Sequence, residues 1–325
     1  DLSRWMYHHP ETAFEESETS AKLAGYLASH GFEVEYPAYG LETAFAARVG
    51  SAGPEVVVCA ELDALPEVGH ACGHNIIAAA AIGAGLAVAP QVDDLGIQVT
   101  VLGTPAEEAY GGKVDLIHAG AFEDVAAAMM VHPANDDIVD RNWLAVIQFD
   151  VEFRGKESHA AFTPQVGINA LDAAVQAYVN ISTLRQAIYP SDKIHGVITH
   201  GGDVPNVIPA FTSMSWYARA ISKERLDELY PKVLAAFEGA AMATGCSVEV
   251  KQRGHAYTDM VVDPVMADLY AQNSAAIGRP MHRMSEFVHS TRPSTYIASS
   301  LYDLLFTHPA TDIGAAASLV HHSGF

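Results

Sequence analysis

The sequence predicts an α/β protein in which a mostly parallel-sheet domain carries a smaller inserted domain of βαββαβ order. Three observations lead to this prediction. The chain has 325 residues, enough for two domains of ordinary size. Apolar runs with strand-like and helix-like spacing alternate through the first 142 residues, as they do in βαβ units. Beyond residue 142 the elements follow a different order, which marks the second domain.

The first domain is predicted from its alternating elements. Residues 15–30 have helical spacing, and Gly31 ends that helix. The strands expected next are Ala44–Val49, Glu55–Ala60 and Ile97–Leu102, with an Ala-rich helix over residues 76–90 between the last two. Loops at 63–75 and 103–112 follow the second and third of these strands. Because ligands of parallel α/β sheets bind at the carboxyl ends of the strands, we expect the functional site in these loops.

The second domain is predicted from elements in β-α-β-β-α-β order, which is the ferredoxin-like arrangement. They are strand Ala145–Arg154, helix Gly167–Ile188, strands Ile194–Thr199 and Phe211–Ala220, helix Lys223–Thr244 and strand Ser247–Arg253. Helical periodicity resumes at Tyr257. We therefore expect a discontinuous first domain over residues 1–142 and 257–325, with residues 143–256 inserted as the second domain.

Charge and composition narrow the class of function. The formal net charge is −21, from 39 acidic and 18 basic residues. Such a field repels phosphate backbones and anionic membrane surfaces, so we expect neither nucleic acid nor a membrane as partner. The longest apolar stretch, residues 76–90, is shorter than the ~20 residues of a membrane helix, which indicates a buried helix. Three cysteines cannot form a disulfide framework, so we expect a reducing compartment, the cytoplasm.

Two short motifs in the expected loops carry groups that bind metals. Cys72 and His74, with His70 just before them, precede the Ala-rich helix, and a thiolate with imidazoles suits zinc or a manganese-like ion. Taken alone this motif is weak, because such residues are as often core or capping groups. The adjacent Glu107 and Glu108 follow an apolar strand, where one carboxylate can bind a metal while its neighbour takes a proton from water. An isolated pair would favour a solvated acidic turn, but this position reverses that preference.

Three further residues are candidates for the functional site, and each also has a competing interpretation. His132 ends the apolar run 126–131 and precedes Pro133, which favours a metal ligand over a buried helical position. Asp63 also follows a strand, and a turn aspartate is an equally good interpretation. His159 falls in the inserted domain, where a surface histidine is the default. It would reach a metal site only across an interdomain cleft or from another subunit.

Several motifs that occur in order make the chain resemble a known family. They are AELDALPEVGHACGHN, GTPAEEAYGGKVDLIHAGAF, AMMVHP, FRGKESHAAFTPQVGINALDA, GGDVPNVIP and HHSGF. This combination is similar to the M20 metallopeptidases in their amidohydrolase branch, near aminobenzoyl-glutamate hydrolases and M20 domain-containing dipeptidases. The resemblance implies a di-metal catalytic domain and a ferredoxin-like lid domain that also mediates dimerisation, and hence a homodimer.

The same resemblance implies a role for each candidate residue. Cys72 would bridge two divalent metal ions, zinc or manganese, in place of the family's more usual aspartate. The other metal ligands would be His74, Glu108, His132 and, from the HHSGF motif, His321, with His322 as a competitor. Glu107 would be the general base, Asp63 would support the metal site, His159 would stabilise the oxyanion, and Asn206 would bind substrate, within its own subunit or across the dimer.

The reaction that these roles imply is hydrolysis of the amide bond of a small N-acyl amino acid or dipeptide-like substrate. Glu107 would deprotonate a water that two divalent ions activate. Aminobenzoyl-glutamate-like, N-acetyl and β-alanyl substrates all remain open. Two other classes compete with this hypothesis: a non-catalytic metal-binding or ligand-binding protein that retains the fold, and a thiol-based redox protein using Cys72. The absence of a C-x-x-C motif disfavours the redox protein.

Two departures from the family pattern bear on activity. Asn75 stands where relatives have an aspartate in CGHD, which removes a carboxylate beside His74. Tyr296, within the altered stretch 294–309, stands where relatives have another aspartate. These departures predict changed specificity or reduced activity. The second permits the non-catalytic alternative, although every candidate ligand and the candidate base are present in the sequence.

Overall fold

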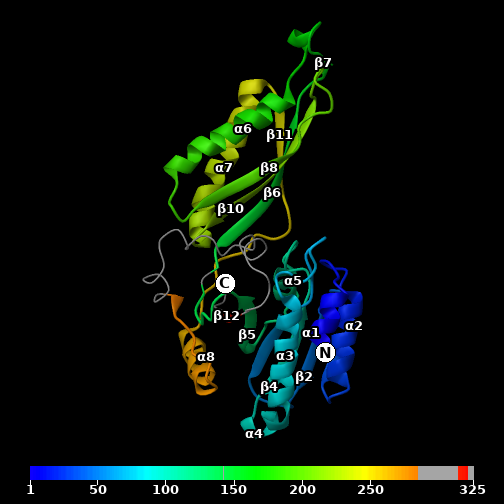
Figure 1. The fold of residues 1–325 in the computed structure, drawn as a ribbon, viewed down its shortest axis with the longest axis vertical. Coiled ribbons are helices and arrows are strands. Elements are labelled where there is room, and N and C mark those ends of the chain that lie inside the picture. Colours follow the sequence, from blue (N-terminus) through cyan, green and yellow to red (C-terminus); the bar gives the residue numbers. More distant parts are fainter. Residues whose placement is uncertain (142, 285–313, 321–325) are drawn as a thin grey trace. The chain divides into compact units, whose positions relative to one another are not determined.

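The computed structural model describes residues 1–141, 143–284 and 314–320, the last range as backbone only. The chain divides into two compact units, residues 1–142 with 261–325, and residues 143–260 (Figure 1). The chain returns from the second unit to the first after Met260, whereas the sequence predicted this boundary after residue 256. The reason is that Tyr257 exchanges backbone hydrogen bonds with Val146 of the second unit.

The first unit is built on a mixed sheet whose described strands lie in the order β1-β2-β4-β3-β5-β12. The strands are β1 (Glu33–Glu35), β2 (Phe45–Val49), β3 (Glu55–Glu61), β4 (Gln98–Thr104), β5 (Val125–Ala134) and β12 (Gly314–Val320). β3 is parallel to both β4 and β5, whereas β1, β2 and β12 pair antiparallel with their neighbours. The predicted α/β fold class is confirmed, but the sheet is mixed rather than mostly parallel, because among the described strands only β3, β4 and β5 pair in parallel. The carboxyl ends of these three central strands meet at one edge.

Helices cover both faces of this sheet. They are α1 (Leu2–His8), α2 (Ser17–Ala28), α3 (His74–Val88), the 3₁₀ turn η1 (Ala89–Gln91), α4 (Val92–Leu95), α5 (Gly112–His118) and α8 (Pro264–Ala276). Alternate residues of β3 point to opposite faces. Val58 and Ala60 pack in the core with α1, α2 and α3, and Val57 and Cys59 pack in a second core that includes Leu116 of α5.

One helical stretch of the described chain, His74–Leu95, is long and apolar enough to cross a membrane by length and composition alone. It is longer than the predicted helix because η1 and α4 continue directly from α3. Core helices pass the same test. Ile77, Ala78 and Ile82 of α3 are buried, and the latter two pack in the core of the sheet. The position of α3 against the sheet therefore supports the predicted buried helix.

The second unit has the predicted ferredoxin-like order. Its antiparallel sheet, β11-β6-β10-β8, is formed by β6 (Ala145–Arg154), β8 (Lys193–His200), β10 (Phe211–Ala220) and β11 (Ser247–Gln252). Two helices, α6 (Ala170–Leu184) and α7 (Lys223–Thr244), pack on it around Phe149, Trp216 and Phe237. Short 3₁₀ turns lie at Pro164–Val166 (η2) and Arg185–Ala187 (η3). A separate two-stranded ribbon joins β7 (Ser158–His159) to β9 (Val207–Ile208).

Candidate metal centre

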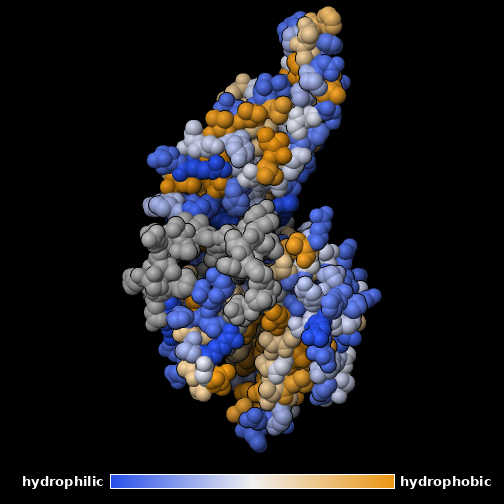
Figure 2. All heavy atoms as spheres, viewed as in Figure 1, coloured by the Kyte–Doolittle hydropathy of each residue, from blue (hydrophilic) through white to orange (hydrophobic). Residues whose placement is uncertain are grey.

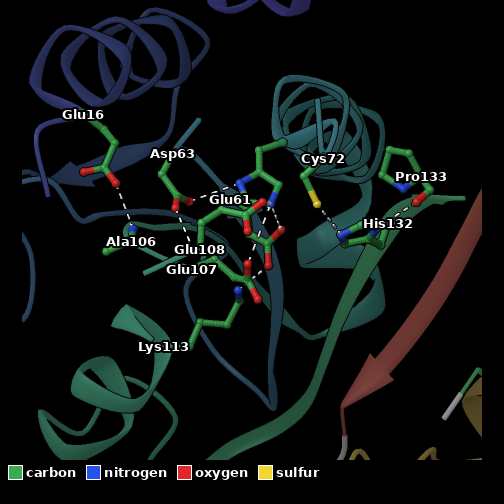
Figure 3. A network of polar contacts seen from close by, with 11 residues as sticks. Glu16, Glu61, Asp63, Cys72, Ala106, Glu107, Glu108, Lys113, His132 and Pro133 are labelled. Carbon is green, nitrogen blue, oxygen red and sulfur yellow. Dashed lines mark hydrogen bonds and ion pairs between the residues drawn. The ribbon is translucent and has the colours of Figure 1, made fainter. Parts of the chain in front are cut away.

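Side chains from several elements converge at the carboxyl edge of the central strands (Figure 3). Glu61 ends β3, Glu107 and Glu108 follow β4, and His132 lies near the end of β5. His74 is the first residue of α3, and Cys72 precedes it. The loop between β3 and α3 packs closely on β5. Gly73 has φ +85°, and a Cβ there would lie 2.8 Å from Cγ of Pro133, so glycine permits this approach.

The potential ligands form two groups that share His74. Within the described residues, ligand atoms of Cys72, His74 and His132 all lie within 4.8 Å of one another, and so do those of His74, Glu107 and Glu108. The Sγ of Cys72 lies 3.5 Å from Nε2 of His132, and His74 Nε2 lies 3.7 Å from Oε1 of Glu108. Ligands that bind one zinc ion at about 2.0–2.3 Å lie about 3–4 Å apart, so these separations fit a shared ion.

Asp63 links the two parts of the centre. Its Oδ1 lies 3.1 Å from Nδ1 of His74, and both side chains are fully buried. Its Oδ2 accepts a hydrogen bond of 2.9 Å from the backbone N–H of Glu108. Asp63 therefore orients the imidazole ring and also anchors the loop that carries the paired glutamates. A carboxylate behind a ligand histidine has this arrangement in many metal sites.

The structure adds two residues that sequence reasoning missed, Glu61 and Lys113. Glu61 is 2% exposed and forms an ion pair with the Nζ of Lys113, and its Oε2 lies 3.1 Å from His74 Nε2. The available signal was the glutamate at the end of an otherwise apolar strand, two residues before Asp63. The importance of Lys113 had no comparable signal, because the pairing joins residues that are 52 positions apart.

Three buried polar atoms that lie close together but lack hydrogen bonds within the described part of the chain indicate that the centre fits a cation. Oε2 of Glu61, Nε2 of His74 and Oε1 of Glu108 are buried and have no hydrogen-bond partner among the described residues. An unsatisfied buried polar group costs about 1–3 kcal/mol, and more when it is charged. A divalent ion would satisfy these atoms together, and the combination of thiol, imidazole and carboxylate is chemically suited to one.

Burial alters the acidity of the candidate ligands and of the candidate base. It raises the pKa of the Cys72 thiol to about 12. Burial, and then the charges of Glu61 and Glu108, raise the pKa of Glu107. The side chain of Glu107 is 34% exposed, whereas that of Glu108 is 8% exposed. Glu107 is therefore the more exposed carboxylate of the pair.

The loop that carries the paired glutamates is anchored on both sides of Glu107. Ala106 is buried with φ +56°, a left-handed conformation that is unfavourable for alanine. Its N–H donates a hydrogen bond of 2.8 Å to Oε1 of the buried Glu16 (Figure 3). The N–H of Glu108 on the other side is held by Asp63. These contacts position Glu107, and sequence reasoning did not identify Glu16.

In the second unit, the β7–β9 ribbon brings His159 and Asn206 together. His159 pairs with Val207 across the ribbon, and the N–H of Ala160 donates a hydrogen bond of 3.0 Å to the carbonyl of Asn206. His159 Nδ1 accepts a hydrogen bond of 3.2 Å from the N–H of Ala161. His159 and Asn206 are both exposed. The ribbon thus places the backbone of Asn206 beside that of Ala160, the neighbour of His159.

The remaining sequence predictions near the centre have different outcomes. His321, its competitor His322 and the stretch 294–309 with Tyr296 lie outside the described residues. Asn75 donates hydrogen bonds to the carbonyl and Oγ of Ser3, at 3.1 and 3.0 Å, so it ties α3 to α1. His70 is buried, belongs to neither ligand group, and neither of its ring nitrogens has a hydrogen-bond partner among the described residues.

Comparison with known proteins gives concordant matches. Residues 145–243 match the model of the peptidase dimerisation domain, M20_dimer. The chain is 37% identical to Xaa-Arg dipeptidase of Mus musculus, over 97% of this chain and 77% of that protein. It is 33% identical to one component of the p-aminobenzoyl-glutamate hydrolase of Escherichia coli, over 77% of this chain and 56% of that protein.

Solved structures show the same fold. An aminobenzoyl-glutamate utilization protein from Klebsiella pneumoniae matches with a TM-score of 0.69 and 21% identity, over 87% of this chain and 82% of that chain. A dinuclear metal-binding peptidase of the M20 family from Bacillus subtilis matches with a TM-score of 0.64 and 24% identity, over 87% of this chain and 80% of that chain.

Proposed function

This chain belongs to the M20 family of peptidases and amidohydrolases, and we propose that it hydrolyses the amide bond of a dipeptide or small N-acyl amino acid at the metal centre described above. The observation that carries the proposal is the convergence of thiol, imidazole and carboxylate groups around His74, with the partly exposed Glu107 beside them. Among known relatives, a dipeptidase, an aminobenzoyl-glutamate hydrolase and an N-acetyl-L-cysteine deacetylase all act on such linear amides.

We propose two divalent ions as the cofactor, with zinc or manganese as the candidates. The residues that would hold them are Cys72, His74, Glu108 and His132, together with His321 from the sequence motif. The thiol favours zinc, while the imidazole and carboxylate groups also accept manganese. When bound, such ions supply Lewis acidity that polarises the amide carbonyl and lowers the pKa of water.

The protein's own groups would handle the proton. Glu107 takes a proton from the attacking water and delivers it to the leaving amine, which requires a carboxylate that reaches substrate from a fixed backbone. Its exposure and its two anchored neighbours, Ala106 and Glu108, support this role. From the second unit, we propose His159 as the group that stabilises the oxyanion and Asn206 as a substrate-binding residue.

The function is tested with metal analysis and turnover on the same preparations. Elemental mass spectrometry should find about two divalent ions per wild-type chain. Glu107→Gln should keep these ions and lose about 10²–10⁴-fold in kcat, since it removes only the proton acceptor. Glu18→Gln, an exposed substitution in α2, is the matched control and should retain wild-type kcat. Near-normal hydrolysis by Glu107→Gln would show that the base is another residue.

The substrate panel distinguishes the amide classes from one another and from the non-catalytic alternative. We propose dipeptides as the first class to test, because the dipeptidase relative matches 97% of this chain and the aminobenzoyl-glutamate hydrolase matches 77%. The panel contains dipeptides ending in arginine, lysine or neutral residues, aminobenzoyl-glutamate and N-acetyl amino acids. The highest kcat/KM identifies the class. A chain that binds metal but turns over none of them would support the non-catalytic alternative.

We also propose that the second unit forms a homodimer through β8 and α6. β8 lies at an edge of the sheet, so its outer backbone groups are available for pairing with another strand. Apolar side chains lie over both elements (Figure 2), with Val197 59% exposed on β8 and Val179 48% exposed on α6. The match to a peptidase dimerisation domain supports a second copy of this chain as the occupant.

Sedimentation at micromolar concentration tests the dimer. The wild type should sediment as a dimer, and Val197→Lys combined with Val179→Glu should sediment as a monomer, because charges in an apolar interface are strongly unfavourable. Met242→Lys, on the exposed side of α7, is the control and should remain a dimer. A monomeric wild type would contradict the proposal.

A further inference from the structure

The two carboxylate oxygens of Glu61 face different partners. Oε1 forms an ion pair with the Nζ of Lys113, in the first turn of α5. Oε2 lies 3.1 Å from Nε2 of His74. The side chain is 2% exposed, and Oε2 has no hydrogen-bond partner among the described residues. A buried carboxylate oxygen therefore points at the ring nitrogen that would bind a metal.

The separation between Glu61 and His74 is that of two ligands on one ion. Asp63 contacts Nδ1 of the His74 ring, so Nε2 is the nitrogen left for a cation. Nitrogen and oxygen ligands bind zinc at about 2.0–2.2 Å, and two such ligands at about a right angle lie about 3 Å apart. One ion would satisfy both Nε2 of His74 and Oε2 of Glu61.

Lys113 explains how a further carboxylate can be buried beside this centre. Glu61, Asp63 and Glu108 are all at most 8% exposed. Burying another unpaired carboxylate among them would be strongly unfavourable. Because Lys113 pairs with Oε1, the Glu61–Lys113 pair brings a ligand oxygen to the centre without adding net charge. The pairing also leaves a single oxygen of Glu61 for a metal.

We propose that Glu61 is a further ligand of the metal centre, binding through Oε2 the same ion as Nε2 of His74, with Lys113 as the positioning residue that holds the other oxygen. This inference rests on the proposed function, because it requires a divalent ion at the centre. The competing explanation is that Glu61 is only the buried counter-ion of Lys113.

Three variants separate these explanations: Glu61→Gln, Lys113→Met and the double variant. Glu61→Gln leaves the partly buried ammonium group of Lys113 without its ion-pair partner, and Lys113→Met leaves the buried carboxylate of Glu61 without its lysine partner, so either single change can destabilise the fold. The double variant removes both charges at nearly constant volume. Each full chain, freed of metal, is titrated with Co²⁺. Calorimetry then measures the stoichiometry and dissociation constant, and the visible absorption of Co²⁺ reports its ligand set.

If Glu61 is a ligand, the double variant folds but binds one ion at least about tenfold more weakly than the wild type, and its Co²⁺ spectrum changes. Lys113→Met keeps the carboxylate and should keep the wild-type spectrum. A double variant with wild-type stoichiometry, affinity and spectrum would overturn the inference and leave Glu61 as a counter-ion. A wild-type chain that binds no Co²⁺ would instead overturn the proposed function, so the two failures are distinguishable.

Discussion

Two glycines inside α3 test how this helix packs on the sheet. Gly83 is exposed, and a Cβ there would meet no atom within 4 Å. A Cβ on Gly85, one half-turn further along, would lie 2.5 Å from Cγ2 of Val101 in β4. Ordinary carbon contacts are about 3.5–4.0 Å, so the added methyl group would overlap Val101 by about 1 Å. We expect Gly83→Ala to stabilise the protein and Gly85→Ala to destabilise it.

The structure sets the magnitude of each effect. Replacing glycine by alanine inside a helix contributes about 0.5–1 kcal/mol at either position. At Gly85, overpacking opposes this gain by about 1–3 kcal/mol, because both the helix and the strand must shift. The difference between the two variants therefore isolates the overpacking, since both share the same gain in helix propensity. In a unit of this size, each kcal/mol shifts Tm by about 2–4 °C.

Thermal unfolding of the metal-free chain measures both variants. Gly83→Ala should raise Tm by about 1–4 °C. The Tm of Gly85→Ala should be lower than that of Gly83→Ala by about 2–12 °C. Adding Gly85→Ala to a Val101→Ala background should raise Tm, because the smaller side chain makes room for the methyl group. The reasoning is refuted if Gly85→Ala stabilises the wild type as much as Gly83→Ala does.

Three further predictions concern titration, thiol reactivity and metal binding. Burial raises the pKa of Glu16. The folded chain therefore holds a proton that the unfolded chain loses above about pH 4.5, so the free energy of unfolding falls as the pH rises. Glu16→Gln should remove this dependence, so thermal unfolding from pH 4.5 to 8 should show the variant gaining stability relative to the wild type. In metal-free protein at pH 8, iodoacetamide should label Cys246 and spare Cys59 and Cys72. The reason is that burial raises the pKa of the Cys59 thiol to about 11 and that of the Cys72 thiol to about 12. Mass spectrometry of the labelled peptides checks this. Zinc at 100 times its dissociation constant should stabilise the folded chain by about 2.7 kcal/mol, raising Tm by about 5–11 °C in a calorimetric scan, and a chelator should reverse the shift.

Elements with strong local signals were predictable from the sequence. The bounds of β6, β10 and α7 agree with the predicted ranges. β10 alternates buried and partly exposed residues along its whole length, which is the signature of a strand with one covered face. α7 begins after Ser222, whose side chain accepts a hydrogen bond from the N–H of Arg225, and it ends at Gly245 in a left-handed conformation. These signals lie within a few residues of the boundary that they set.

The candidate ligands were also predictable, because each belongs to a motif at the end of a predicted strand or helix. Cys72, His74, Glu108 and His132 were all proposed from the sequence, and the structure brings them together. Their convergence follows from the parallel pairing of β3 with β4 and β5, which places three strand ends at one edge.

Only the tertiary structure decided which groups support and complete the centre. Glu61 and Lys113 are 52 residues apart, and Glu16 and Ala106 are 90 apart, so no local pattern indicates either contact. The antiparallel pairing of β2 and β12 at the flanks likewise depends on neighbours remote in sequence. Periodicity and capping act over one or two turns of chain, and they determined the elements and the motifs. Burial, charge pairing and the approach of distant backbone arise only when the chain packs, and they determined the surroundings of His74.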